Sequence, residues 1–184
     1  MTPFKFFTLL ALALTLGACD GGYHEHVHDA YHDGGQPLDD APALLSFDVI
    51  DSYGSNSAFD LGAELALSPY IDDGNFEIDW SVDTLSSYHI RFYLNDVDSI
   101  DNAILVASNT CGFGYACGNH SYQQCHYTED FQMGCSRPES SSWQGYRDIG
   151  PLVAEVPQTA FLVVEACDSS DFYCEFATHQ IQLE

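Results

Sequence analysis

Four histidines lie within nine residues near the start of the chain, at His24, His26, His28 and His32. An extended segment would point the first three to one side, and a helix would align His24, His28 and His32. Imidazoles with neighbouring carboxylates suit Zn²⁺, Cu²⁺ or Ni²⁺. Because neutral imidazole is the ligand, binding should weaken as the pH falls through about 6.5. We therefore predict a transition-metal site here, with a solvated polar tether as the alternative.

A second candidate site lies in the stretch CGFGYACGNHSYQQCHYTEDFQMGC, residues 111–135. The aromatic side chains that could form a surface here are Tyr115, Tyr122, Tyr127, Phe131 and, after the stretch, Trp143. Aromatic residues are enriched at recognition surfaces. The stretch therefore predicts a surface that binds an envelope protein or a glycan. The alternative is that these rings cover disulfides and cap one end of the fold.

Three acids in the stretch LNDVDSIDN, Asp96, Asp98 and Asp101, offer oxygen ligands of the kind that Ca²⁺ takes. The stretch departs from the EF-hand pattern because Ile100 occupies a ligand position and no glycine follows. We expect a solvated acidic turn here and no calcium site. The chain also lacks H-E-x-x-H, G-x-S-x-G and a phosphate-binding glycine loop, so we expect a protein that is not an enzyme.

The first residues have the three parts of an export signal. Lys5 is followed by the apolar run FFTLLALALTL, which is too short to span a bilayer, and then by Gly17, Ala18 and Cys19. Leu16-Gly17-Ala18-Cys19 resembles the lipobox of bacterial lipoprotein precursors. That resemblance implies cleavage before Cys19, lipid on its thiol, and an extracytoplasmic protein anchored to a membrane. It leaves open which membrane and leaflet; the alternative is an ordinary secreted cysteine.

The six cysteines that remain after Cys19 form an even set, which in an oxidising compartment predicts three disulfides. Cys167 and Cys174 lie at the two ends of an expected hairpin, so we pair them with each other. The other four are expected to pair among themselves, with the connectivity left open. A zinc site is the rival, but these four lack the close C-x2-C pairs of structural zinc sites. They are Cys111, Cys117, Cys125 and Cys135.

Charge and length limit the class of protein. The 184 residues carry 28 acids against four lysines and arginines, a net charge of −24. Nucleic acid is excluded as a partner because phosphate binding needs clustered Lys and Arg. The expected organisation is a signal peptide at 1–18, a histidine-rich acidic tether at 19–43, and one folded domain at 44–184. Nothing in the sequence indicates an oligomeric state.

From Leu44 onward the hydrophobic pattern has period two, which predicts an antiparallel β-sandwich. NFEIDWSV points Phe76, Ile78, Trp80 and Val82 to one face, and YHIRFYL continues the pattern. Asp73-Gly74 predicts a hairpin turn between DLGAELAL and NFEIDWSV. Trp80, YHIRFYL and TAFLVVEACD resemble strands B, C and F of fibronectin type III and immunoglobulin-like modules. A long disulfide-rich loop insertion is expected at about 109–150. Further strands are expected at 45–51, 61–67, 103–108, 152–156, 160–167 and 174–183.

Overall fold

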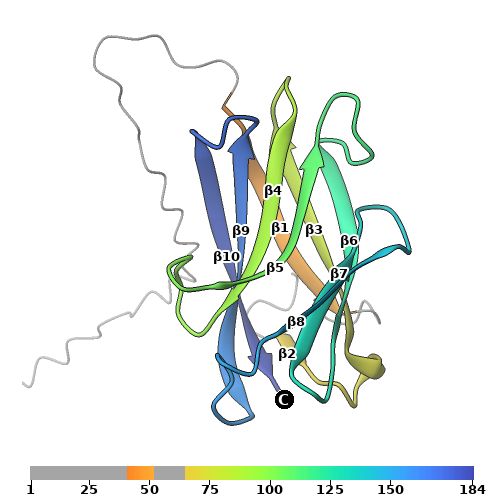
Figure 1. Cartoon of the computed structure of the whole chain (residues 1–184), viewed down its shortest axis with the longest axis vertical. Coiled ribbons are helices and arrows are strands. Elements are labelled where there is room, and N and C mark those ends of the chain that lie inside the picture. The colour runs from red at the N-terminus through yellow and green to blue at the C-terminus, as the bar shows by residue number, and fades with distance from the viewer. Residues whose placement is uncertain (1–40, 52–64) are drawn as a thin grey trace, which may run out of the picture.

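The computed structural model describes residues 41–51 and 65–184, which form two packed five-stranded sheets (Figure 1). The all-β sandwich expected from the sequence is confirmed. The first sheet has the order β1 (Ala43–Asp51), β3 (Asn75–Asp83), β6 (His120–Tyr127), β7 (Gln132–Ser136), β8 (Trp143–Asp148). The second has the order β2 (Leu65–Leu67), β10 (Cys174–Leu183), β9 (Gln158–Asp168), β4 (Tyr88–Asn95), β5 (Ile104–Cys111).

The core lies between the sheets and is built by the alternating residues of β3 and β4. Phe76, Ile78 and Trp80 are fully buried, as are Ile90 and Phe92 of β4. The Trp80 and Phe92 rings meet across the two sheets with centroids 5.2 Å apart. Such aromatic pairs add packing energy beyond the area that they bury, so these strands set how the sheets are positioned.

The expected loop insertion at 109–150 is wrong in one respect, because this region contributes three strands to the first sheet. β6 pairs with β3, and β7 and β8 extend the sheet beyond it. Residues of β6 alternate between buried and exposed, but two of its buried positions hold Ser121 and Gln123. Polar residues at inward positions hide the alternation of hydrophobicity by which a strand is recognised.

Two local predictions are also wrong. Residues 152–156 form turns between Pro151 and Pro157 instead of a strand; proline cannot donate to a ladder. Asp73-Gly74 lies in a 3-10 turn, η1 (Asp72–Gly74), which links β2 to β3 across the two sheets, so the two strands form no hairpin. Of the predicted strand at 61–67, the structure describes the part at Leu65–Leu67; Leu61 and Ala63 lie outside the described residues.

The strand register places three turns at the same end of the sandwich, which we call the apex. They are residues 84–87 between β3 and β4, 112–119 between β5 and β6, and 169–173 between β9 and β10. The apex is the upper end in Figure 1, and β1 begins there because Ala43 pairs with Asp83. We call the opposite end the base. Within the described residues, no helix is long and apolar enough to cross a membrane.

Candidate functional site

The two candidate sites nearest the N-terminus lie outside the described residues. These are the lipidation site Cys19 and the histidine set His24, His26, His28 and His32. Both stay predictions. The candidate sites that the structure can test are the cysteines, the acidic turn and the aromatic surface.

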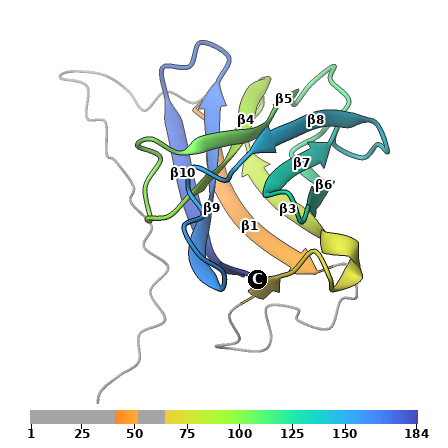
Figure 2. The ribbon, with the colours of Figure 1, turned by 60° about the horizontal axis from the view of Figure 1, so that its bottom comes forward.

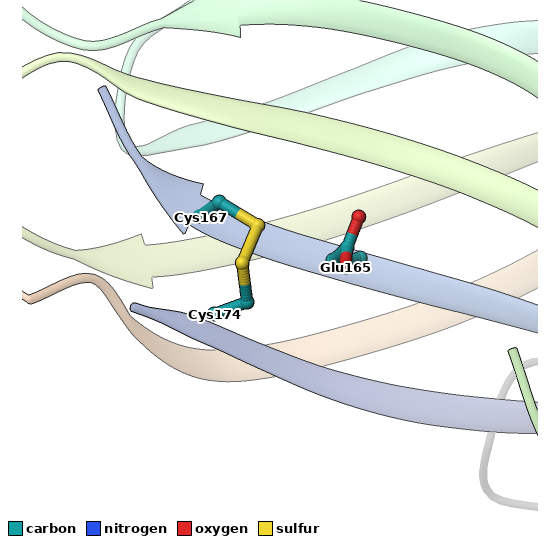
Figure 3. A group of neighbouring side chains, drawn as sticks. All are labelled: Glu165, Cys167 and Cys174. Atoms are coloured by element: carbon teal, nitrogen blue, oxygen red, sulfur yellow. A yellow bond between two sulfur atoms is a disulfide. The ribbon is translucent and has the colours of Figure 1, made fainter. Parts of the chain in front are cut away.

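All six remaining cysteines are paired, so the predicted disulfides are present. Cys167 is bonded to Cys174, and the two lie opposite each other on β9 and β10 (Figure 3). The connectivity left open by the sequence is Cys111–Cys117 and Cys125–Cys135. The first closes the apical turn between β5 and β6, and the second joins β6 to β7. Three disulfides indicate a domain that is exposed to an oxidising, extracytoplasmic compartment.

Figure 3 shows Glu165 beside this disulfide, in the one group of three metal-ligating residue types that converges within the described chain. The geometry does not suit a metal, because the two sulfur atoms are bonded to each other. The Glu165 carboxylate is also occupied: it accepts hydrogen bonds from Arg91 at 3.1 Å and from the Tyr93 hydroxyl at 2.9 Å. Burial and this contact with Glu165 raise the pKa of Tyr93 to about 12.

The acidic turn between β4 and β5 is organised by an amide. Asn95 Nδ2 donates to the carbonyl oxygens of Ser99, at 2.6 Å, and Asp101, at 3.2 Å. Asp96, Asp98 and Asp101 have exposed side chains, and their carboxylates are not among the converging groups of the described residues. These two hydrogen bonds from Asn95 hold the turn in its conformation.

The aromatic surface is only partly as predicted. Tyr115, Tyr122 and Trp143 are exposed, at 54%, 42% and 43% of their surface. Tyr127 is fully buried, and its assignment to the surface is wrong. The reason is strand parity: Tyr127 is two residues from Cys125 and shares its inward-facing side of β6, whereas Tyr122 faces outward.

Tyr115 and Trp143 both line an open groove of about 500 Å³. It lies where β5 of the second sheet approaches β7 and β8 of the first (Figure 2). One wall comes from β5 and the disulfide-closed turn, and the other from the β7–β8 turn and β8. Arg137 makes no ion pair among the described residues, so its guanidinium is available to a ligand. The lining comprises Ser108, Asn109, Thr110, Tyr115, Ala116, Cys117, Arg137, Pro138, Trp143 and Gln144.

The amide side chains of the groove are held in fixed orientations. Gln144 Nε2 donates to the Ser136 carbonyl oxygen at 2.9 Å and to Asn109 Oδ1 at 2.8 Å. Asn109 Nδ2 in turn donates to Gln123 Oε1 at 3.0 Å. The chain of bonds leaves Gln123 Nε2 buried without a partner among the described residues. Because the Ser136 carbonyl can only accept, it fixes each amide in this chain in turn.

Trp143 also belongs to an aromatic group on the outer face of the first sheet. Its ring stacks on Tyr146 with centroids 5.8 Å apart and an interplanar angle of 13°. The Tyr146 hydroxyl lies 2.8 Å from His126 Nδ1. His126 and Tyr146 both pair with Gly134, which lies between them on β7. They can meet because glycine places no side chain there; a Cβ on Gly134 would lie 3.0 Å from Tyr146 Cδ1 and 2.5 Å from the Gly145 carbonyl oxygen.

Sequence reasoning considered His126 only with His120, as a ligand of the rival zinc site, and missed Tyr146 and Gln144, because these residues come together only through strand pairing. A signal was present in the pattern WQGYRD, in which two aromatic residues flank a glycine. In the comparisons with known proteins, no protein-family model matches the chain, and no match was found among curated proteins or solved structures. The function must therefore be argued from the groove itself.

Proposed function

We propose that the protein is a lipid-anchored, non-enzymatic module of a bacterial envelope that binds a glycan in the groove between β5 and β8. The observation that carries this proposal is the meeting of Tyr115 and Trp143 in one open groove. Tyr115 lies in the turn between β5 and β6, and Trp143 is the first residue of β8. Both side chains are exposed. Exposed large aromatics around a shared hollow mark recognition surfaces.

The chemistry of the lining favours a glycan over a protein. The apolar C–H faces of sugar rings stack on flat aromatic rings, which Tyr115 and Trp143 supply. Sugar hydroxyls need hydrogen-bonding groups held in place, and Asn109 and Gln144 are oriented by their bonds to each other. Such pre-organisation lowers the entropy lost on binding. Arg137 adds a cation that suits a carboxylate or phosphate on the glycan.

One pair of a hydroxyl and an imidazole lies near the groove. Thr110 Oγ1 lies 3.2 Å from His89 Nδ1, which resembles a nucleophile beside a base. Within the described chain, however, His89 makes no hydrogen bond to a carboxylate that would orient its ring. Nucleophilic catalysis usually relies on such a third group. We therefore assign this pair to the cross-strand contacts of β4 and β5.

Strand positions support an immunoglobulin-like relationship, which we propose as the fold ancestry. β3, β4, β9 and β10 occupy the places of strands B, C, F and G, with β9 between β4 and β10. The departure concerns β6, the strand that pairs with β3. In the immunoglobulin fold the strand beside B directly precedes F along the chain, whereas here β7 and β8 come between β6 and β9. In our proposal the two extra strands extend the sheet and create the second wall of the groove.

The proposal is tested by screening the purified mature protein against an array of envelope glycans, then titrating any bound glycan. Trp143→Ala should weaken binding about tenfold or more, as for a central aromatic contact. Tyr70→Ala is the matched control, because Tyr70 is 77% exposed on the turn after β2, at the base. Unchanged affinity in Trp143→Ala would overturn the proposal. Binding of a protein, and of no glycan, that is lost in Trp143→Ala would replace the glycan assignment.

The histidine tract supports a second candidate function, capture of Zn²⁺, Cu²⁺ or Ni²⁺ at the membrane surface. The observation in its favour is the spacing of His24, His26, His28 and His32. Calorimetric titration of each ion into the mature protein tests it against a variant with alanine at all four positions. Sub-micromolar binding that disappears in the variant would support metal capture. Binding that is unchanged in the variant, or absent from both proteins, would reduce the tract to a tether.

A further inference from the structure

Each of the three apical turns presents a large apolar side chain that is more than three-quarters exposed to solvent. Leu85 is 87% exposed, Phe113 is 92% exposed and Phe172 is 78% exposed. Their turns share the upper end of the molecule in Figure 1. Single exposed apolar residues are common on proteins, and the base exposes Tyr70 and Ile71, but at the apex three such side chains lie on three separate turns. We call Leu85, Phe113 and Phe172 the apical tips.

The turns that carry the tips are held in place. Cys111–Cys117 closes the turn that contains Phe113, and Cys167–Cys174 closes the turn that contains Phe172. The Asp168 carboxylate accepts a hydrogen bond from the Phe172 backbone N–H at 2.7 Å. Within the apex, the exposed phenylalanines therefore lie on constrained turns, and their presentation to solvent is built into the fold.

The first two turns also lie directly against each other. Gly112 has a φ of +95°, and a Cβ there would lie 2.5 Å from the Ser86 carbonyl oxygen. Only glycine permits this close approach and this backbone conformation together. The turn of Phe113 is thereby packed on the turn of Leu85, which makes these two tips parts of one surface.

Charge is distributed unevenly between the two ends. Residues 84–87 and 112–119 contain no acid, and Asp171 of the third turn is paired with Arg91 at 2.6 Å. The strand ends beside these turns carry two acids, the exposed Asp83 and Asp168, whose carboxylate accepts a hydrogen bond from the third turn. The turns and chain ends away from the apex carry most of the acids of the described loops. These are Asp72, Asp73, Asp96, Asp98, Asp101, Glu129, Asp130, Glu155 and Glu184. When the apex faces a membrane, these acids therefore lie on the side of the domain away from the lipid headgroups.

The entry of the chain points the same way. β1 begins at the apex, so the segment that leads back to Cys19 joins the domain there. If residues 20–40 act as the linker that the sequence predicts, their end-to-end distance is about 25 Å. A tether of that length would let an anchor at Cys19 and the apical tips reach one membrane surface.

We propose that the apical tips dock on the lipid surface to which the anchor holds the protein. This proposal rests on the lipid anchor at Cys19, which belongs to the proposed function. Phenylalanine and leucine are the side chains that interfacial proteins bury at the boundary of headgroups and acyl chains. Separate tips on convex turns fit a deformable lipid surface. Docking would orient the sandwich upright on the membrane.

The test places a fluorescent probe at each end of the lipidated mature protein in phosphatidylcholine vesicles that contain brominated lipid. Phe113→Trp puts the probe at a tip, and Tyr70→Trp is the matched control at the base. Trp80 and Trp143 contribute the same background to both variants. Bromolipid should quench the added fluorescence of Phe113→Trp and leave that of Tyr70→Trp unchanged. Equal quenching of the two variants, or none, would overturn the proposal.

A second measurement separates this proposal from the anchor. The mass of the mature N-terminal peptide reports whether Cys19 carries lipid. Protein released from its anchor by proteolysis before the domain should still partition into the vesicles. The variant Leu85→Ser/Phe113→Ser/Phe172→Ser should partition about tenfold less. If Cys19 carries no lipid and the triple variant still partitions less than the wild-type domain, the proposed anchor is wrong and the docking surface is supported. Partitioning that is unchanged by the three substitutions would overturn the docking surface.

Discussion

Trp80 Nε1 donates a hydrogen bond to the Tyr88 hydroxyl oxygen at 3.1 Å, and the two residues belong to opposite sheets. The Tyr88 hydroxyl in turn donates to the Gly118 carbonyl oxygen at 2.8 Å. Both rings are fully buried. A single hydroxyl group therefore joins the first sheet, the second sheet and the apical turn at 112–119. A buried indole N–H needs such an acceptor.

Removal of this hydroxyl should destabilise the protein. In Tyr88→Phe the Trp80 N–H loses its acceptor in the core, and we expect the free energy of unfolding to fall by about 1–3 kcal/mol. Urea denaturation with the disulfides intact measures it. Tyr122→Phe is the control, because Tyr122 is exposed and the loss of its hydroxyl should have little effect. Equal stability of Tyr88→Phe and wild type would show that the bond between the sheets contributes nothing.

Gly134→Ala should disturb the aromatic group beside the groove. The added methyl group would meet the Gly145 carbonyl oxygen and the Tyr146 ring, and such overpacking costs about 1–3 kcal/mol. We expect a lower free energy of unfolding and a changed NMR chemical shift of the His126 ring. Gly118→Ala is the control, since its Cβ would have the His120 carbonyl oxygen as its nearest contact, at an ordinary 3.9 Å. A spectrum of His126 that Gly134→Ala leaves unchanged would contradict this account.

The Tyr93–Glu165 contact predicts a loss of stability in alkali. The pKa of Tyr93 is about 12 in the folded protein, chiefly because of burial and then because of Glu165, against about 10 when unfolded. The folded state thus holds the phenolic proton more tightly, so this contribution is complete below pH 10 and is lost as the pH rises toward 12. Urea denaturation at pH 9, 10 and 11 should show a smaller alkaline decline for Tyr93→Phe than for wild type.

Two further measurements check this alkaline effect. Glu165→Gln should lower the pKa of Tyr93, because it removes the negative charge beside the hydroxyl, and tyrosinate absorbance reports that shift. The pKa values of Tyr88 and Tyr127 are also raised by burial, but both tyrosines are present in wild type and in Tyr93→Phe. The difference between the two proteins therefore isolates Tyr93. Parallel stability curves would show that Tyr93 makes no contribution.

Two acids oppose each other on the outer face of the first sheet, where Asp48 of β1 pairs with Asp79 of β3. Burial raises the pKa of Asp79 and the charge of Asp48 raises it further, although His120 opposes this. Because the pKa of Asp79 is raised in the folded protein, the contribution of this carboxyl group to stability is complete at low pH and is lost as the pH rises through that pKa. Asp48→Asn should lessen the decline and stabilise the protein at pH 7 by about 0.2–1 kcal/mol.

Urea denaturation at pH 7 and at pH 4 measures the effect of Asp48→Asn, and the gain should be larger at pH 7. Asp83→Asn is the matched control, because Asp83 pairs with Ala43 and opposes no charge. His179, whose pKa is lowered by burial, is neutral at pH 7, so the loss of Asp48 costs little there. A gain of equal size in the control would assign the effect to net charge.

Strands whose inward residues are all apolar could be predicted from the sequence, and β3 and β4 are the clearest cases. Burial in β3 follows the alternation of apolar and polar residues in the sequence, because Phe76, Ile78 and Trp80 are more stable in the core than in water. β6 could not be predicted in this way. Its buried Gln123 is acceptable because Asn109, on a strand of the other sheet, donates to it. That partner is fourteen residues away, and no local pattern indicates it.

The candidate site divides in the same way. The sequence indicated Tyr115, Tyr122 and Trp143 by residue type, and it indicated the bond between Cys167 and Cys174 by hairpin position. It could not separate the buried Tyr127 from the exposed Tyr122, because the assignment of faces depends on the parity of an unrecognised strand.

The amino-acid sequence by itself determined the sandwich class, the facing of β3 and β4, and the disulfide-forming character of the chain. These properties follow from hydrophobic periodicity and cysteine number, which are local or compositional. Only the tertiary structure decided that β6, β7 and β8 form a sheet, that Trp143 meets Tyr115, and that Phe113 lies at the same end as Leu85 and Phe172. Such meetings are set by strand pairing between distant segments, whose registers depend on the packing of the whole core.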